Sequence, residues 1–83
     1  MKKMEIDMRP LLPLNRVSAA LLAQTSSRFE SRITLEKDSI VLNMKSMLGL
    51  LSQPDFGNGS VMLVADGEDE DAAIEAILAI CRV

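Results

Sequence analysis

The chain has 83 residues, 48% of them hydrophobic, so it is long enough for one small hydrophobic core and too short for two. Its formal net charge of −3 provides no basic field, which argues against direct nucleic-acid binding through counterion release. The absence of histidine removes the commonest general base and metal ligand, and a single cysteine, Cys81, excludes an internal disulfide or a cysteine metal site.

These numbers predict a single domain over residues 1–83 that carries no metal and no cofactor. The N-terminal residues are charged and then alternate, without the apolar stretch of a secretory signal. No apolar run approaches the roughly 18 residues that a membrane span needs. We therefore expect a cytoplasmic protein without a membrane anchor.

The first predicted element is a strand. Residues 4–8 (MEIDM) alternate apolar and polar, which places Met4, Ile6 and Met8 on the inner face of a half-buried strand. The prolines of residues 9–13 lack backbone donors and bias the preceding residues toward extended geometry. A loop is therefore expected at residues 9–13.

A helix is predicted over residues 16–27. Asn15 stands immediately before it and is a favourable N-cap, and the residues Thr25, Ser26 and Ser27 end it. With Leu14 ahead of the helix, the spacing of Val17, Ala20, Leu21 and Gln24 indicates a helix.

Two alternating segments follow, at residues 31–38 and 39–44, and the break between them falls at Asp38-Ser39. The first has Ile33 and Leu35 on one face; the second has Ile40, Leu42 and Met44. This pattern predicts a β-hairpin.

The rest of the chain predicts a short helix, a loop, a strand and a final helix. Ser46 is placed to cap a helix of about one and a half turns from Met47, and residues 53–59 (QPDFGNG) carry a dense loop signal. Residues 60–65 (SVMLVA) are an apolar strand. The acidic run at 66–71 turns the chain and suits the positive end of a helix that ends near Arg82, whose apolar positions are Ala73, Ile74, Ile77, Leu78 and Cys81.

The predicted element order is strand, helix, strand, strand, short helix, strand, helix (βαββαβα). Without a long repeat or regular βα alternation, the simplest assembly is one four-stranded antiparallel sheet with the three helices on one face. The expected fold class is α+β, an open-faced β-sandwich.

Several motifs resemble the HPr family, the small phosphocarriers of the bacterial sugar phosphotransferase system. Residues 42–52 (LNMKSMLGLLS) resemble the family's regulatory-serine segment, in which a Lys-Ser pair opens a short apolar helix with glycine three residues after the serine. Residues 67–71 (GEDED) resemble the turn before the family's last helix, and residues 26–39 resemble its first helix end and second strand. The resemblance covers nearly the whole chain.

The chain departs from this family in the active centre. Where the family has a Gly-Leu-His-Thr-Arg-Pro-Ala pattern, residues 13–19 read PLNRVSA. The histidine position falls on Asn15, the phosphate-holding arginine on Val17 and the proline on Ser18, while Arg16 lies one residue from the arginine position. The resemblance is to the histidine-less, catabolite-repression branch of HPr-like proteins.

Asn15 has two compatible interpretations, a plain helix cap and the remnant of a lost phosphorylation site. A carboxamide has no basic nitrogen lone pair comparable to that of imidazole, so it cannot form the phosphoramidate that the family makes with enzyme I. Ser18 is a weak nucleophile without an adjacent base. We therefore expect no catalytic residue and no enzymatic activity.

Ser46 is the predicted regulatory phosphorylation site. In the resembling family this serine is phosphorylated by HPr kinase/phosphorylase, and the product is a corepressor of a catabolite-control transcription factor. A phosphate on an N-cap serine would face free backbone N–H groups at the helix start. The alternative is an unmodified N-cap.

The short helix is also predicted to present a partner-binding surface. Met47, Leu48, Leu50 and Leu51 cannot all point inward from so short a segment. Lys45, Arg16 and Arg9 are expected to add positive charge near this surface. The predicted partner-binding residues are Arg16, Val17, Lys45, Met47, Leu48 and Leu51.

Two other functions stay open at this point. One is a phosphocarrier that uses a residue other than histidine; the other is a diverged interaction or oligomerisation domain without phosphorylation, which Val17 in place of arginine favours. A homodimer formed by exchange of the first strand about the loop at 10–13 is compatible with the sequence.

Overall fold

The computed structural model describes residues 1–9, 14–53 and 60–81. The predicted loop residues 10–13 and 54–59, and Arg82 at the predicted helix end, lie outside the described residues. Within these ranges the elements follow the predicted order and are β1 (Lys2–Asp7), α1 (Arg16–Ser27), β2 (Arg32–Lys37), β3 (Ile40–Asn43), α2 (Met47–Leu51), β4 (Ser60–Asp66) and α3 (Glu70–Cys81).

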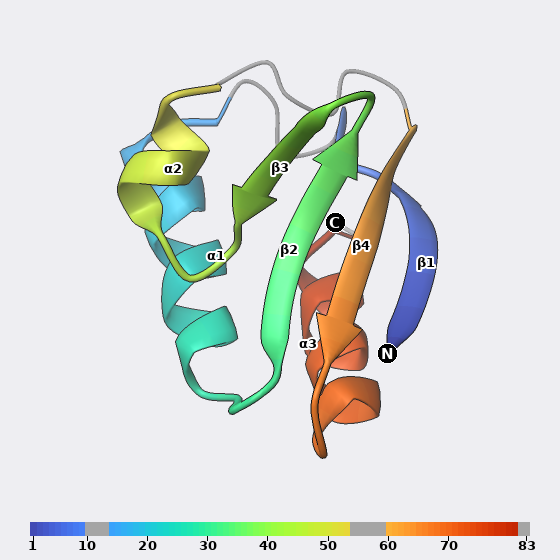
Figure 1. Cartoon of the computed structure of the whole chain (residues 1–83). Coiled ribbons are helices and arrows are strands. Elements are labelled where there is room, and N and C mark those ends of the chain that lie inside the picture. The colour runs from blue at the N-terminus through green and yellow to red at the C-terminus, as the bar shows by residue number, and fades with distance from the viewer. Residues whose placement is uncertain (10–13, 54–59, 82–83) are drawn as a thin grey trace.

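The four strands form one antiparallel sheet in the order β1-β4-β2-β3. The helices cover one face of this sheet and leave the other face open (Figure 1). The fold is therefore the predicted α+β open-faced sandwich. The central position of β4, between the first and second strands, was not part of the sequence prediction.

The core lies between the helices and the covered face of the sheet. Because side chains alternate along a strand, one row of paired residues faces the helices, and Leu63, Leu35 and Leu42 stand side by side in it. The helices contribute apolar side chains of α1, α2 and α3 to the same cluster, and the fully buried ones include Leu22, Leu50 and Ile77.

The hairpin turns where the sequence predicted, at Asp38-Ser39 between β2 and β3. Asp38 has a φ of 56°, in the left-handed region that aspartate tolerates better than most residues. Of the predicted inner residues, Ile33, Leu35, Leu42 and Met44 are buried, while Ile40 is exposed at the turn end of the hairpin.

The bounds of α1 are confirmed, and the structure adds which side of the helix is buried. Val17, Leu21 and Gln24 are exposed, and the buried residues are Ala19, Leu22, Ala23 and Ser26. Both sets have helical spacing, because apolar residues occupy more than half of the helix circumference. The stripe rich in alanine lies against the core, and the larger Val17 and Leu21 face outward.

Only part of the inner face of β1 is buried. Ile6 and Met8 are in the core as predicted, but Met4 is 37% exposed because β1 is an outer strand of the sheet. The sulfur of Met8 lies 3.6 Å from the Cys81 sulfur. Burial raises the pKa of the Cys81 thiol, so this cysteine is a core residue that stays protonated.

The connection between β4 and α3 is held against the start of β2. The Asp69 carboxylate accepts hydrogen bonds from the Glu30 and Ser31 backbone N–H groups, both at 2.9 Å, and from the Ser31 hydroxyl. Gly67 permits this approach, because a Cβ there would lie 2.5 Å from the Ser31 Oγ. The acidic turn therefore has a structural role, and Glu70 and Asp71 occupy the first turn of α3 as predicted.

Candidate functional site

Asn15 is the N-cap of α1, as the sequence predicted. Its backbone is extended (φ −129°, ψ −177°), and its Oδ1 accepts hydrogen bonds from the N–H groups of Val17 at 2.9 Å and Ser18 at 3.0 Å. The Asn15 N–H in turn donates to the Ser18 Oγ at 3.0 Å, which completes a capping box. Asn15 and Ser18 thus satisfy the first turn of the helix between them.

This geometry does not favour a nucleophilic reaction at either side chain. The Ser18 Oγ lies within 3.3 Å of the Asn15 carbonyl oxygen and 3.4 Å of its Oδ1, so the hydroxyl is held inside the box. Neither contact is with a basic group that would activate an oxygen nucleophile.

Ser46 caps α2 as predicted. Its Oγ accepts a hydrogen bond from the Gly49 N–H at 3.0 Å, and its backbone is extended (φ −105°, ψ 109°). The side chain is half-buried. A Cβ at Gly49 would stand 3.3 Å from the Ser46 Oγ, so glycine at this position keeps space open beside the hydroxyl.

Two of the three cations expected near Ser46 form hydrogen bonds within the chain. The Arg9 guanidinium holds the Asp7 carboxylate through contacts of 2.6 to 3.0 Å, and these hydrogen bonds lower the pKa of Asp7 to about 2. The Lys45 Nζ donates to the Phe29 carbonyl oxygen at 2.7 Å and so ties the start of α2 to the end of α1. Arg16 is exposed on the first turn of α1.

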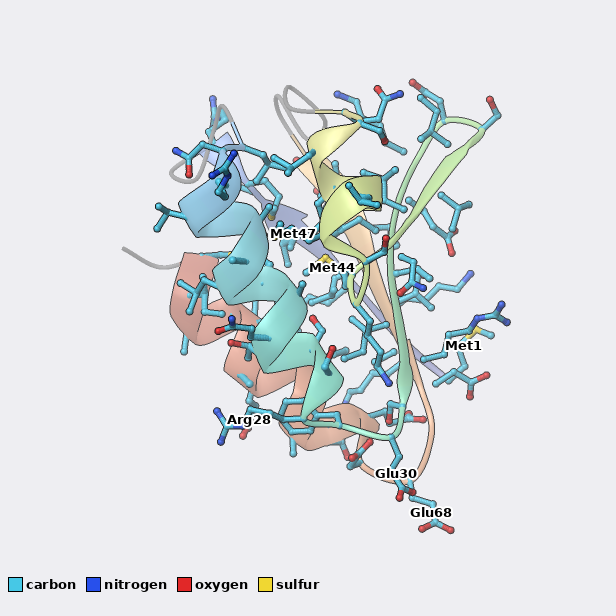
Figure 2. The ribbon with its side chains drawn as sticks, turned by 90° about the vertical axis from the view of Figure 1, so that its left-hand side faces the viewer. Met1, Arg28, Glu30, Met44, Met47 and Glu68 are labelled. Atoms are coloured by element: carbon cyan, nitrogen blue, oxygen red, sulfur yellow. The ribbon has the colours of Figure 1, made fainter. Side chains whose placement is uncertain are left out.

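Exposed apolar side chains gather on α1 and α2, which contact each other. Val17 and Leu48 are each 79% exposed and Leu21 is 47% exposed. Met47 lies on the side of α2 toward α1 (Figure 2), and Met47 and Leu51 are partly buried against the core, whereas Leu50 is fully buried. We call the outer side of these two helices the α1–α2 surface; it comprises Arg16, Val17, Leu21, Lys45, Met47, Leu48 and Leu51.

The two helices flank an open depression of about 360 Å³. It is lined by Ala20, Ala23, Gln24, Ser27, Lys45 and Met47. Sequence reasoning did not assign Ala20, Leu21 or Gln24 to this surface. Their helical spacing with Val17 predicts the helix, but it does not indicate that these residues line a depression beside α2.

The α1–α2 surface is positive in charge although the whole chain is negative. Neither helix contains an aspartate or glutamate, and Arg16 and Lys45 stand at their N-terminal ends. A partner at this surface would meet apolar side chains beside positive charge.

No group of three or more potential metal ligands occurs among the described residues, and none of the helices described there is long and apolar enough to cross a membrane.

Comparison with known proteins gives a matching family and a number of similar chains. The family described as "PTS HPr component phosphorylation site" matches residues 14–82. The HPr-like protein Crh of Bacillus subtilis is 38% identical over 79 residues, which cover 95% of this chain and 93% of Crh.

Two solved structures share the fold. HPr-C-His from Thermoanaerobacter tengcongensis has a TM-score of 0.86 at 37% identity, covering 98% of this chain and 91% of that one. The Crh structure from Bacillus subtilis, described as a dimer with a swapped domain, has a TM-score of 0.76 at 36% identity and covers 99% and 94%.

Proposed function

This chain belongs to the HPr family, and we propose that it is a regulatory member that acts through phosphorylation of Ser46 and through protein contacts in carbon catabolite control. In this proposal it does not carry phosphoryl groups, because Asn15 occupies the position of the phosphorylated histidine. We expect a non-enzymatic cytoplasmic protein whose partners are an HPr kinase/phosphorylase and a catabolite-control transcription factor.

The geometry of Ser46 carries the proposal. The hydroxyl is half-buried, accepts only the Gly49 N–H among the described groups, and has space beside it where Gly49 lacks a side chain. A phosphate on this oxygen would lie next to the first turn of α2, whose first N–H groups have no intrahelical acceptors. Modification is thus compatible with an intact helix.

The α1–α2 surface is the proposed site of partner binding. The predicted contact residues are Arg16, Val17, Lys45, Met47, Leu48 and Leu51. A phosphate on Ser46 would change the charge beside the exposed Leu48 and so alter which partners bind there.

A kinase assay tests the first step. The chain is incubated with ATP and an HPr kinase/phosphorylase, and the modified residue is mapped by mass spectrometry. The expected result is one phosphate on Ser46, absent from the Ser46→Ala variant. Ser52→Ala is the matched control, because Ser52 is an exposed serine on the same segment whose hydroxyl donates to the Gly49 carbonyl oxygen at 2.6 Å. A label that persists in Ser46→Ala would contradict the proposal.

The second step is tested by binding. Chain phosphorylated on Ser46 is expected to bind the catabolite-control transcription factor more tightly than unmodified chain, and Leu48→Ala is expected to weaken that complex. Equal binding of both forms would leave Ser46 without a regulatory role.

A second candidate function is an interaction or oligomerisation domain that works without phosphorylation. Val17 favours it, because an apolar residue exposed by 79% stands where the family has its phosphate-holding arginine. The similarity to a Crh dimer with a swapped domain supports a homodimer as one form of this function. Incubation with enzyme I and phosphoenolpyruvate is expected to leave the chain unlabelled under either candidate, whereas labelling would favour a phosphocarrier.

A further inference from the structure

β1 is an outer strand of the sheet, and one of its edges has no neighbour among the described strands. β4 is its only hydrogen-bonded partner there (Figure 1). Such an edge presents a row of backbone N–H and C=O groups with which an extended peptide can pair. Residues 2–7 contain no proline or glycine that would prevent this pairing.

An open depression of about 540 Å³ lies beside this edge, on the helix side of the sheet. Met4 is 37% exposed at its wall, and Leu78 adds apolar surface from α3. Because paired residues of neighbouring strands point to the same side of a sheet, a residue opposite Met4 on an added strand would direct its side chain into this depression. The residues of β1 and α3 that line it are Lys2, Met4, Asp71, Ile74, Glu75 and Leu78.

The α3 side of the depression is acidic. α3 carries Glu70, Asp71 and Glu75 and contains no lysine or arginine. Lys2 is the only basic residue in the lining, and its ammonium group already forms an ion pair with Asp71. This hydrogen bond and the charges of Glu70 and Glu75 raise the pKa of Lys2. Glu75 is exposed and forms no ion pair within the described residues, so its carboxylate is available to a cation of a partner.

A second uncompensated carboxylate lies on the open face of β1. Ile6 is buried under the helices, so Met4 also faces the helix side and Glu5 faces the open side. Glu5 is exposed, stands opposite the apolar Met62 of β4, and forms no ion pair in the described part of the chain. Glu5 and Glu75 therefore border the same strand edge, one on the open face and one on the helix side.

We propose that the edge of β1 and the depression beside it, together called the β1–α3 groove, bind an extended basic segment of a partner protein as a fifth, antiparallel strand. A large apolar side chain such as leucine lies opposite Met4 and fills the depression. The residue before it is arginine or lysine and lies opposite Glu5. A second basic residue, two positions after the apolar one, lies on the helix side near Asp71 and Glu75. The recognised pattern is basic, apolar, any residue, basic.

The β1–α3 groove is separate from the α1–α2 surface. β1 forms one end of the sheet, and β3, which contacts α2, forms the other end (Figure 1). A segment bound along β1 therefore leaves Ser46 uncovered, and the chain can hold a partner at each end of the sheet. Binding at the groove does not depend on phosphorylation of Ser46, because its affinity comes from main-chain pairing and its specificity from the apolar and acidic positions.

Fluorescence anisotropy with a labelled synthetic peptide tests the groove. The probe is fluorescein-Ser-Val-Arg-Leu-Thr-Arg-Val-Ser-amide, and the unmodified chain should bind it with a dissociation constant of about 0.1 mM or tighter. Glu5→Lys and Glu75→Lys should each weaken binding roughly tenfold, because each turns an attractive pair into a repulsive one. Glu30→Lys, at an exposed position between α1 and β2 that does not line the depression (Figure 2), is the control for net charge.

A charge exchange tests the register. A second probe has glutamate in place of the first arginine, the residue that lies opposite Glu5 in the proposed pairing. The Glu5→Lys variant should bind this probe roughly tenfold more tightly than the unmodified chain does, because the exchange restores an attractive pair with reversed sign. The same preference is not expected of Glu75→Lys, which lies on the helix side.

Two N-methylated probes test the main-chain pairing. Alternate residues of an added strand direct their N–H groups toward β1, so methylation of one alternate set should abolish binding and methylation of the other set should preserve it. Leu48→Ala, on the α1–α2 surface, should bind the first probe as tightly as the unmodified chain. The proposal is overturned if no binding occurs up to about 1 mM chain, or if both methylated probes bind equally. It is also overturned if Leu48→Ala weakens binding, or if Glu5→Lys and Glu75→Lys weaken it no more than Glu30→Lys.

Discussion

Replacing Asn15 with alanine tests whether this residue acts as a cap. The alanine variant loses the acceptor for the Val17 and Ser18 N–H groups, which lie 2.9 and 3.0 Å from Oδ1. Loss of such a cap costs about 1 kcal/mol, and in a domain of this size that lowers Tm by roughly 4 to 8 °C. Asn15→Asp keeps an acceptor at the same position and adds a favourable charge at the helix N-terminus, so it should retain full stability.

Urea unfolding followed by circular dichroism measures both variants against the unmodified chain. The Ser18→Ala variant and the Asn15/Ser18 double variant complete a cycle. Because the two side chains form one capping box, the double loss should be smaller than the sum of the single losses. An alanine variant as stable as the unmodified chain would refute the cap and reopen the question of what the carboxamide does.

Three further substitutions probe the scaffold around the site. Hydrogen bonds from Ser31 and Glu30 lower the pKa of Asp69 below its unfolded value near 3.9, so its stabilisation is present above about pH 4 and is lost as pH falls through the folded pKa. Asp69→Asn should therefore reduce the free energy of unfolding at neutral pH. It should also reduce the loss of stability on acidification, as measured by urea unfolding at several pH values. Gly67→Ala should destabilise by about 1 to 3 kcal/mol in urea unfolding, because its Cβ would lie 2.7 Å from the Ser31 Cα. Ser26→Ala should be neutral or raise Tm, because the buried Ser26 hydroxyl has no hydrogen-bond partner within the described residues.

The sequence predicted what depends on neighbouring residues and missed what depends on distant ones. The bounds of α1 follow from the cap residue before it and the polar run after it, and both are local signals. Which side of α1 is buried depends on how closely it approaches α2 and α3, and two apolar stripes compete for that side. Alanine permits the closer approach, and nothing local to the helix indicates this.

The candidate site shows the same division. Both N-caps, Asn15 and Ser46, were predicted because capping acts within three residues. The partners of Arg9 and Lys45 were not. Asp7 holds Arg9 from the end of the preceding strand, and Lys45 reaches a carbonyl oxygen sixteen positions earlier in the chain. Arg9 is therefore paired with a carboxylate, whereas Lys45 keeps its positive charge beside Ser46, because its acceptor is a neutral carbonyl oxygen.

Under the proposed correspondence of Asn15 with the family's histidine, more than the nucleophile changes at this position. In the family the helix-terminal amides stabilise the phosphate, whereas here the N–H groups of Val17 and Ser18 already donate to the Asn15 Oδ1. A free anion would have to displace this internal acceptor, and no arginine stands at position 17 to compensate. In this proposal the Asn15 side chain competes with a phosphate for the first-turn N–H groups of α1. At Ser46 the acceptor is the hydroxyl oxygen that phosphorylation would modify. Among the described groups it accepts a hydrogen bond only from the Gly49 N–H. Both cap residues have extended backbones, but Asn15 accepts hydrogen bonds from two N–H groups in a capping box, whereas Ser46 accepts one.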